Sequence, residues 1–161
     1  MVEYHNEQAK HELTWSTLKH YYVTQRYLVK FMEKRFRKKD VLLHEINYKF
    51  IADFEIYLQS HKPLDHQKPM NNNGVMKHLI RLRKMTNFAI RLDWLPNDTF
   101  KNFKIRHQKV EKEFLTKTEL DKIHKKQLAV ERLEIVRDVF VFCCYTGLTY
   151  VDVLNLKYTN V

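Results

Sequence analysis

Hydrophobic side chains recur at steps of three and four residues through most of the first 95 positions, which is the spacing of a buried helix face. This pattern predicts four helices, over residues 4–13, 16–36, 46–61 and 72–95, the last of which is stopped by Pro96. The fold class that follows is mainly α, with a four-helix bundle at its start. In the three longer helices we expect these side chains to face the core: Tyr21, Leu28, Phe31, Met32, Phe36, Phe50, Ile51, Phe54, Leu58, Val75, Leu79, Leu82, Met85, Ala89 and Leu92.

Polar residues next to these patterns indicate where helices begin. Asn47 is expected to cap the third helix, because its side chain can accept a hydrogen bond from a free backbone N–H. The Pro, Gly and Asn residues of the stretch 62–74 predict a loop. Further on, Thr116 is followed three residues later by Glu119, the capping-box pattern, which predicts a helix over 117–128.

A second apolar helix is expected after that one, over residues 132–146, with Gly147 on the turn that follows it. The helix contains the two cysteines of the protein, Cys143 and Cys144. Adjacent cysteines on a helix point in different directions and do not make a normal disulfide, so we interpret them as reduced core thiols of a cytosolic protein. Metal ligation is the alternative, but no paired Cys or His at ligand spacing supports it. Neither a metal nor another cofactor is expected.

The composition favours a helical protein with a real core. Hydrophobic residues make up 44% of the chain, and it has only 2 Gly and 3 Pro. No apolar run approaches the roughly 18 residues that a membrane span requires, and the polar N-terminus shows no signal peptide. We therefore expect a cytoplasmic protein of one or two small domains.

The positive charge of the chain is concentrated. The net charge is +10, and residues 1–110 carry 21 basic against 11 acidic side chains, whereas residues 111–161 carry eight of each. Within the first part, residues 66–110 hold 10 basic and 2 acidic side chains. A cluster of this kind predicts a polyanionic partner, and nucleic acid is the usual one. An acidic membrane surface is the weaker option, because the basic helix also has a core face to bury.

The fourth helix has two faces of opposite character. Opposite its apolar stripe lie Asn73, Lys77, Arg81, Lys84 and Arg91. A solvated face usually mixes charges of both signs, whereas Lys77 and Arg81 repel each other at a spacing of four residues. A face that binds phosphates is therefore favoured over a simple solvated one.

The stretch after Pro96 interleaves basic residues with Phe100 and Phe103, and we interpret it as a linker over residues 97–113 that lies along a ligand. Its candidate contacts are cations, which would bind phosphates. Together with the fourth helix, the candidate DNA-binding residues are Asn73, Lys77, Arg81, Lys84, Lys104, Arg106 and Lys109. Among them Asn73, which is short and uncharged, is the candidate for contact with base edges.

The stretch "TGLTYVDVLNLK", Thr146 to Lys157, resembles the first catalytic box of the tyrosine recombinases, the phage-integrase family, in the branch common on mobile elements of Bacteroides-type bacteria. The box normally reads Thr-Gly-Leu-Arg, then an acid and a Leu-x-Leu pattern. The resemblance implies a core-binding SAM-like domain over 1–96, the basic linker, and the start of a catalytic domain over 114–161. The residues that match the box are Thr146, Gly147, Leu148, Asp152, Leu154 and Leu156.

The family's reaction implies what this chain contains and lacks. A tyrosine attacks a DNA phosphodiester, and fixed cations stabilise the charge on the phosphate oxygens. Thr149 stands where the family has an Arg, so it offers one neutral hydrogen bond instead of two charged ones. Asp152 is either a supporting acid of the site or an acid at a helix N-terminus. The family's His-x-x-Arg box and nucleophilic Tyr are absent, so the 161-residue chain is predicted to be an inactive fragment.

The resemblance therefore predicts a module that binds double-stranded DNA, and that self-associates on DNA through the full-length protein. Two alternatives stay open. One is a helical DNA-binding regulator with no enzymatic parent. The other is a helical protein–protein adaptor, which predicts a sizeable exposed apolar patch.

Overall fold

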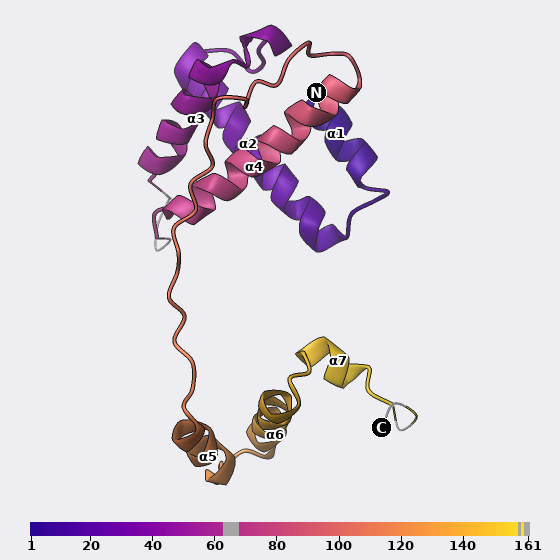
Figure 1. The fold of residues 1–161 in the computed structure, drawn as a ribbon, viewed down its shortest axis with the longest axis vertical. Coiled ribbons are helices and arrows are strands. Elements are labelled where there is room, and N and C mark those ends of the chain that lie inside the picture. The colour runs from indigo at the N-terminus through magenta and orange to yellow at the C-terminus, as the bar shows by residue number, and fades with distance from the viewer. Residues whose placement is uncertain (63–67, 158, 160–161) are drawn as a thin grey trace. The chain divides into compact units, whose positions relative to one another are not determined.

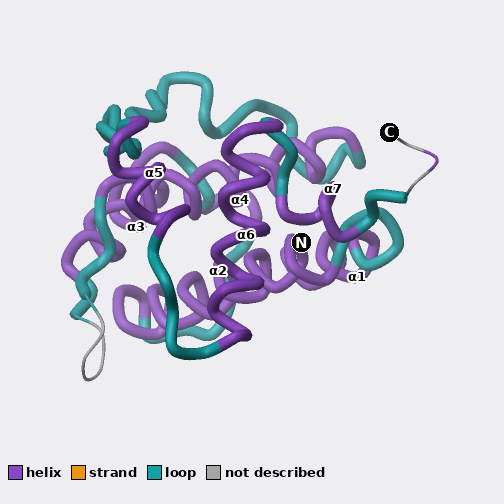
Figure 2. The backbone as a smooth tube through the Cα atoms, turned by 90° about the horizontal axis from the view of Figure 1, so that it is seen from below, coloured by secondary structure: helices purple, strands orange, loops and turns teal. Residues whose placement is uncertain are grey.

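The computed structural model describes residues 1–62, 68–157 and 159, and it divides the chain into two compact units, Met1–Lys109 and Val110–Val161. The described residues form helices and loops and contain no strand (Figure 2). The mainly α fold class is thus confirmed. None of the described helices is long and apolar enough to cross a membrane.

The first unit contains α1 (Val2–Ala9), α2 (Trp15–Phe36), the short 3-10 helix η1 (Leu43–Glu45), α3 (Tyr48–Ser60) and α4 (Asn72–Arg91). In this unit α4 crosses α2, and α1 and α3 pack beside them (Figure 1). The four predicted helices are present, whereas η1 was not predicted. The predicted loop over 62–74 is interrupted by residues 63–67, which lie outside the described residues.

Local side-chain hydrogen bonds set the starts of two helices. The Asn47 side-chain oxygen accepts a hydrogen bond from the Phe50 N–H at 3.1 Å, which confirms the predicted cap of α3. The Asn71 side chain caps α4 in the same way, accepting from the Gly74 N–H at 2.8 Å. A cap of this type contributes about 1 kcal/mol to helix stability.

Two predicted helix ends in the first unit are wrong. The first helix ends at Ala9 rather than residue 13, because the following N–H groups bond three residues back in tight turns. The fourth ends at Arg91, before Pro96 is reached. There Asp93 adopts a left-handed conformation with φ of 57°, and the Trp94 N–H turns back to the Ala89 carbonyl at 2.9 Å. This reversal, and not the proline, terminates α4.

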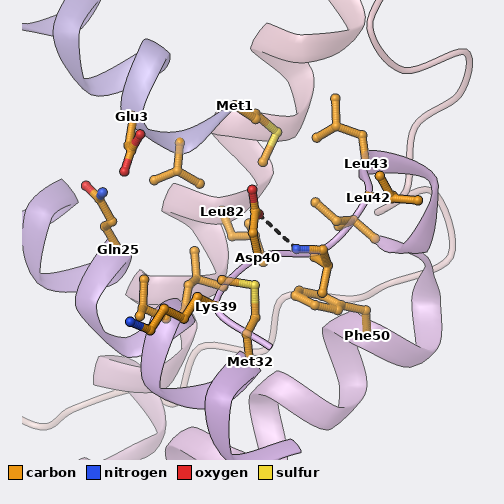
Figure 3. Close-up of a pocket in the computed structure, with 15 residues that line it drawn as sticks. Met1, Glu3, Gln25, Met32, Lys39, Asp40, Leu42, Leu43, Phe50 and Leu82 are labelled. Atoms are coloured by element: carbon orange, nitrogen blue, oxygen red, sulfur yellow. Dashed lines mark hydrogen bonds between the residues drawn. The ribbon is translucent and has the colours of Figure 1, made fainter. Parts of the chain in front are cut away.

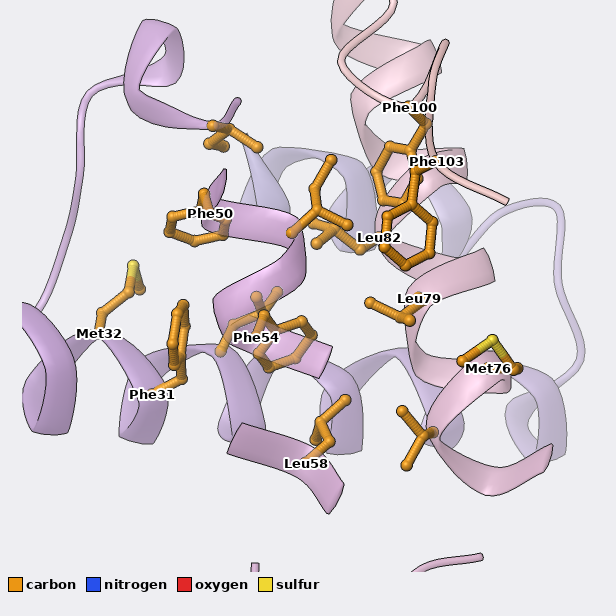
Figure 4. Packing of buried hydrophobic residues seen from close by; sticks show 14 residues of the cluster. Phe31, Met32, Phe50, Phe54, Leu58, Met76, Leu79, Leu82, Phe100 and Phe103 are labelled. Atoms are coloured by element: carbon orange, nitrogen blue, oxygen red, sulfur yellow. The ribbon is translucent and has the colours of Figure 1, made fainter. Parts of the chain in front are cut away.

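Aromatic and aliphatic side chains from α2, α3 and α4 form one core (Figure 4). Phe31 of α2 meets Phe50 of α3 edge to face, with ring centres 5.2 Å apart. The predicted inward stripes are buried except at their ends, where Phe36 is 38% exposed and Leu92 is partly exposed. These two residues lie in the last turn of α2 and just beyond α4, where fewer neighbours cover them.

Phe100 and Phe103 also belong to this core, being 0% and 8% exposed. Their interpretation as linker aromatics that lie along a ligand is therefore wrong. The chain after α4 turns back over the bundle, and burying two aromatic rings there is more favourable than leaving them in water. As a result the segment up to Lys109 lies within the first unit.

The second unit contains α5 (Lys117–Lys125), α6 (Glu131–Thr146) and α7 (Tyr150–Leu154). The helix predicted over 117–128 ends early, at Lys125, because the backbone becomes extended at Lys126. The predicted capping box is confirmed: Glu119 N–H donates to Thr116 Oγ1 at 3.3 Å, and Thr116 N–H donates to Glu119 Oε2 at 2.8 Å. Gly147 ends α6 with φ of 73°, a conformation that favours glycine.

Few side chains of the second unit are buried. Val141 is the one hydrophobic residue of its described part that is buried. The thiols of Cys143 and Cys144 are free, as predicted, but Cys143 is partly exposed and Cys144 is exposed, so their assignment to a core is wrong. The apolar face of α6 that carries them has little of this chain packed against it.

This difference in burial predicts different hydrogen-exchange rates in the two units. Backbone amides of α2, α3 and α4 should exchange far more slowly than those of α6, because opening them exposes a shared core. Exchange measured by mass spectrometry tests this. Protection over residues 131–154 equal to that over residues 15–91 would contradict the assignment of the core to the first unit.

Candidate nucleic-acid interface

The outward face of α4 carries the basic residues that the sequence predicts there. Lys77 and Lys84 are exposed, and Arg81 between them is partly buried. The opposite side of the helix holds core residues such as Val75 and Leu79, both 0% exposed. Helical spacing thus makes one side of α4 core and leaves a row of cations on the other.

These cations have no acidic partner within the described part of the chain. Arg83, which lies off the row, pairs with Asp98 at 3.6 Å between Nη2 and Oδ2. Asp98 therefore neutralises a neighbour and leaves the row positive. The ion pairs between described residues include none of Lys77, Arg81, Lys84, Lys104, Arg106 and Lys109.

The fold restrains two of the cations, one by a contact with α2 and one by partial burial. Lys84 Nζ lies 5.7 Å from the centre of the Tyr21 ring, a cation–π contact. Burial lowers the pKa of the Arg81 guanidinium, although an arginine side chain stays charged in proteins. Restraint of this kind reduces the conformational entropy that is lost when a ligand binds.

A buried histidine lies beneath the row and joins α4 to α2. His78 is 7% exposed, and its Nδ1 is 2.8 Å from Thr24 Oγ1. The Thr24 hydroxyl donates to the His20 carbonyl at 3.0 Å, so its oxygen accepts the Nδ1 proton of a neutral His78. Burial, followed by the charge of Arg81 and by His20, lowers the pKa of His78 to about 4. The ring is thus an uncharged bridge between two helices.

The segment after α4 adds further cations. Phe103 is buried and Ile105 packs against the core, whereas the alternate residues Lys104 and Arg106 are exposed. This alternation is that of an extended chain with one side on the bundle. Lys109 follows and is also exposed. Three of the predicted phosphate contacts are therefore accessible on the first unit.

Asn73, predicted as a base-edge contact, is engaged elsewhere. Its Nδ2 donates to the Gln108 carbonyl and its Oδ1 accepts from the Gln108 N–H, both at 2.8 Å. The neighbouring Asn72 Nδ2 donates to the Arg106 carbonyl at 2.7 Å. The Asn73 side chain therefore contacts the backbone of the basic segment. It does not lie on one surface with the side chains of Lys104, Arg106 and Lys109.

Two exposed residues on the same face of α4 as the cations were not identified as candidates from the sequence. Ile80 is 42% exposed, and Asn87 is exposed with no hydrogen-bond partner for its amide in the described residues. The signal was present, since positions 77, 80, 84, 87 and 91 follow the three- and four-residue steps of one helix face. Asn87 is therefore a polar, uncharged group that lies among the cations.

A cavity of about 390 Å³ lies elsewhere in the first unit, between the start of α1, α2 and the chain around η1 (Figure 3). Its lining is largely aliphatic, and Leu28 and Ile46 belong to the core. Its acidic residues Glu3 and Asp40 are exposed, and Asp40 Oδ1 accepts a hydrogen bond from the Val41 N–H at 2.8 Å. Among the described residues, no group of three His, Cys, Asp or Glu is arranged to hold a metal.

The position predicted to be catalytic is a helix cap. Thr149 is the N-cap of α7, and Asp152 Oδ2 accepts from the Thr149 N–H at 3.0 Å and from its hydroxyl at 2.5 Å. These two hydrogen bonds lower the pKa of Asp152. The geometry is that of an acid at a helix N-terminus, and the role of Asp152 as a supporting acid stays a prediction. The Thr149 hydroxyl is not free in this arrangement.

Comparison with known protein families gives one match over the first unit. A family model described as phage integrase SAM-like domain matches residues 1–105. Searches among curated proteins and among solved structures gave no significant match. The matched range covers α1 to α4 and the chain that follows up to Ile105, so it includes Lys104 but not Arg106 or Lys109.

The buried His78 predicts that acid destabilises the fold. The unfolded state binds a proton below about pH 6.5, whereas the folded state resists it until about pH 4. Stability should therefore be full above pH 6.5 and fall as the pH is lowered towards 4, by about 2 to 3 kcal/mol at pH 4.5. Urea unfolding at pH 7 and pH 4.5, compared with the His78→Gln variant, measures this contribution. An equal acid loss in both proteins would show that His78 is not the group responsible.

Proposed function

The chain belongs to the phage integrase SAM-like domain family, and from this we propose that it is the DNA-binding portion of a site-specific tyrosine recombinase. In full length such a protein would break and rejoin DNA through a phosphotyrosyl intermediate. The observation that carries the proposal is a set of six cations on the first unit that form no ion pair with any described residue. The finer assignments, to the Bacteroides-type branch, to the cytoplasm and to self-association on DNA, belong to the same proposal.

The shape of this surface suits duplex DNA. An α-helix fits the major groove, and a straight row of cations on it can follow phosphates at the groove edge. Lys77 and Lys84 are seven residues apart, which corresponds to about 10 Å along the helix axis. Lys104 and Arg106 extend the charge beyond the helix on a segment of extended chain. Phosphate contacts of this kind fix the position of a protein on DNA without reading its sequence.

Sequence reading would fall to uncharged polar groups within the row. A side-chain amide can form two hydrogen bonds with the edge of an adenine. Asn73 was predicted for this role, but its amide is bonded to Gln108. Asn87 lies on the exposed side of α4, its amide has no hydrogen-bond partner among the described residues, and it is the better candidate. We therefore assign base contact to Asn87 within this proposal.

The catalytic part of the proposal concerns residues 114–161. Thr149 and Asp152 form hydrogen bonds with each other as the cap of α7, and neither of them is a cation. The positive charge that stabilises the scissile phosphate is therefore proposed to come from another part of the recombinase. The many exposed apolar side chains of this unit, among them Phe114, Ile135 and Leu154, support a surface that packs against further protein. This is the feature that the adaptor hypothesis predicted, but it lies on the second unit and not on the basic first unit.

The basic row predicts a defined loss of DNA binding. Replacing Lys77, Arg81 and Lys84 by Gln should weaken binding to duplex DNA and make the slope of log affinity against log salt shallower by roughly 3, because three phosphate contacts are lost. Folding should be preserved, since surface changes of this kind alter stability by about half a kcal/mol or less. Fluorescence anisotropy with a labelled duplex across a salt series measures both quantities.

The matched control replaces three exposed lysines of α2, Lys19, Lys30 and Lys34, which lie outside the basic stretch. Both variants lose the same charge. If the control weakens DNA binding as much as the α4 variant does, the charge acts as a diffuse field and the assignment of a binding face is wrong.

The absence of the family's remaining catalytic groups from this sequence predicts a lack of chemistry. The 161-residue chain, incubated with a nicked suicide substrate, should form no covalent adduct, because the proposed nucleophile lies elsewhere in the recombinase. Denaturing gel electrophoresis of labelled DNA checks this. A DNA-linked band that survives boiling in detergent would show that a tyrosine of this chain attacks phosphate.

A further inference from the structure

Two consecutive asparagines at the start of α4 hold the backbone of a segment more than thirty residues later. Asn73 forms a pair of hydrogen bonds with the Gln108 peptide, one donated and one accepted, each 2.8 Å long. Asn72 adds a bond of 2.7 Å to the Arg106 carbonyl. The paired bonds resemble the exchange between two strands of a sheet, with a side-chain amide in place of one strand.

Hydrophobic contacts and the amides of Asn72 and Asn73 hold different parts of the segment after α4 against the bundle. Phe100 and Phe103 are buried, and Ile105 packs against the core, so the chain is held to the bundle through residue 105 by apolar contact. Beyond that point Arg106 and Gln108 are exposed. In the described part of the chain, the bonds that hold residues 106–108 come from Asn72, Asn73 and the Met76 sulfur, which accepts from the Arg106 N–H at 3.4 Å.

We propose that Asn72 and Asn73 are positioning residues, which hold Arg106 and Lys109 beside α4 in the conformation that contacts DNA. The proposal rests on the proposed function, because it assigns how part of that DNA-binding surface is ordered. Lys104 lies between the buried Phe103 and the packed Ile105, so its position does not depend on the asparagines. The helix N-cap is also independent, because Asn71 provides it.

The same contact sets the length of the free chain between the two units. With the asparagines in place, residues 110–115 connect the docked segment to the Thr116 cap, and six residues span roughly 20 Å at full extension. Release of residues 106–109 would lengthen the free segment to ten residues and its reach to roughly 34 Å. The asparagines therefore also restrict how far the second unit can move from the first.

The test uses the whole chain and the double variant Asn72→Ala with Asn73→Ala, which changes no charge. DNA affinity should fall about tenfold, because residues 106–109 must then be ordered at the moment of binding. The salt slope should stay nearly constant, since the released cations still reach phosphates. Hydrogen exchange of the Gln108 amide should accelerate to the rate of a free peptide in the variant.

A double-mutant cycle distinguishes positioning from direct contact. In a background that carries Arg106→Ala and Lys109→Ala, the asparagine changes should cost less than about twofold, because the cations that they position are gone. In a background that carries Lys104→Ala, the two asparagine changes should still lower DNA affinity about tenfold. A loss that persists without Arg106 and Lys109 would mean that the asparagines contact DNA themselves, and the proposal would be overturned.

Failure of the proposed function gives a different result. If the unchanged chain binds duplex DNA no better than the α4 variant with Lys77, Arg81 and Lys84 replaced, DNA binding by this face is wrong and the positioning role falls with it. If the unchanged chain binds and the asparagine variant binds equally well, only the positioning role is overturned. Should the asparagine variant not fold, exchange in the unchanged chain decides: a slow Gln108 amide supports the contact, and a free-peptide rate overturns it.

Discussion

Burial of the inner side of α4 is the constraint on which the rest of the first unit depends. Val75, Leu79 and Leu82 are 0 to 1% exposed, so the rotation of the helix about its axis is fixed by the core. A fixed rotation means that residues on the other side, at steps of three and four, must face outwards. The cations of α4 are therefore held in a row chiefly by the hydrophobic packing on the other side of the helix, and their mutual repulsion is tolerated because the core outweighs it.

The segment after α4 extends this arrangement to residues that are distant in sequence. Phe100 and Phe103 anchor it in the core, and Asn72 and Asn73 continue the contact where apolar side chains end. Lys104 and Arg106 thereby belong to the same unit as Lys77 and Arg81. Asp98 is paired with Arg83 and does not reduce the charge of the row. A positively charged surface of this kind agrees with the match of the chain to the phage integrase SAM-like domain family.

Features that depend on near neighbours could be predicted from the sequence. The cap at Asn47, the capping box of Thr116 and Glu119, and the inward stripe of α3 each follow from residues within a few positions. The two sides of α4 follow from its periodicity in the same way. Asn87 could also have been found, because it falls on the step that contains Lys77 and Lys84.

Features that depend on how the chain returns on itself could not be predicted. The burial of Phe100 is decided by a turn that begins at the left-handed Asp93, and no local pattern reveals it. The contact of Asn73 with Gln108 joins positions 35 residues apart. The cysteines of α6 were expected to be buried because they lie in an apolar run, but an apolar run is covered only where something packs against it.

The central claim is that DNA binds the outward side of α4 together with the docked basic segment. Backbone amide spectra of the labelled chain, recorded during titration with a duplex, test it most directly. The account predicts that the largest shifts fall on residues 77–91 and 104–109, with little change on α1 and on the cavity residues around η1. Shifts spread evenly over the first unit, or concentrated on α1 and η1, would contradict it.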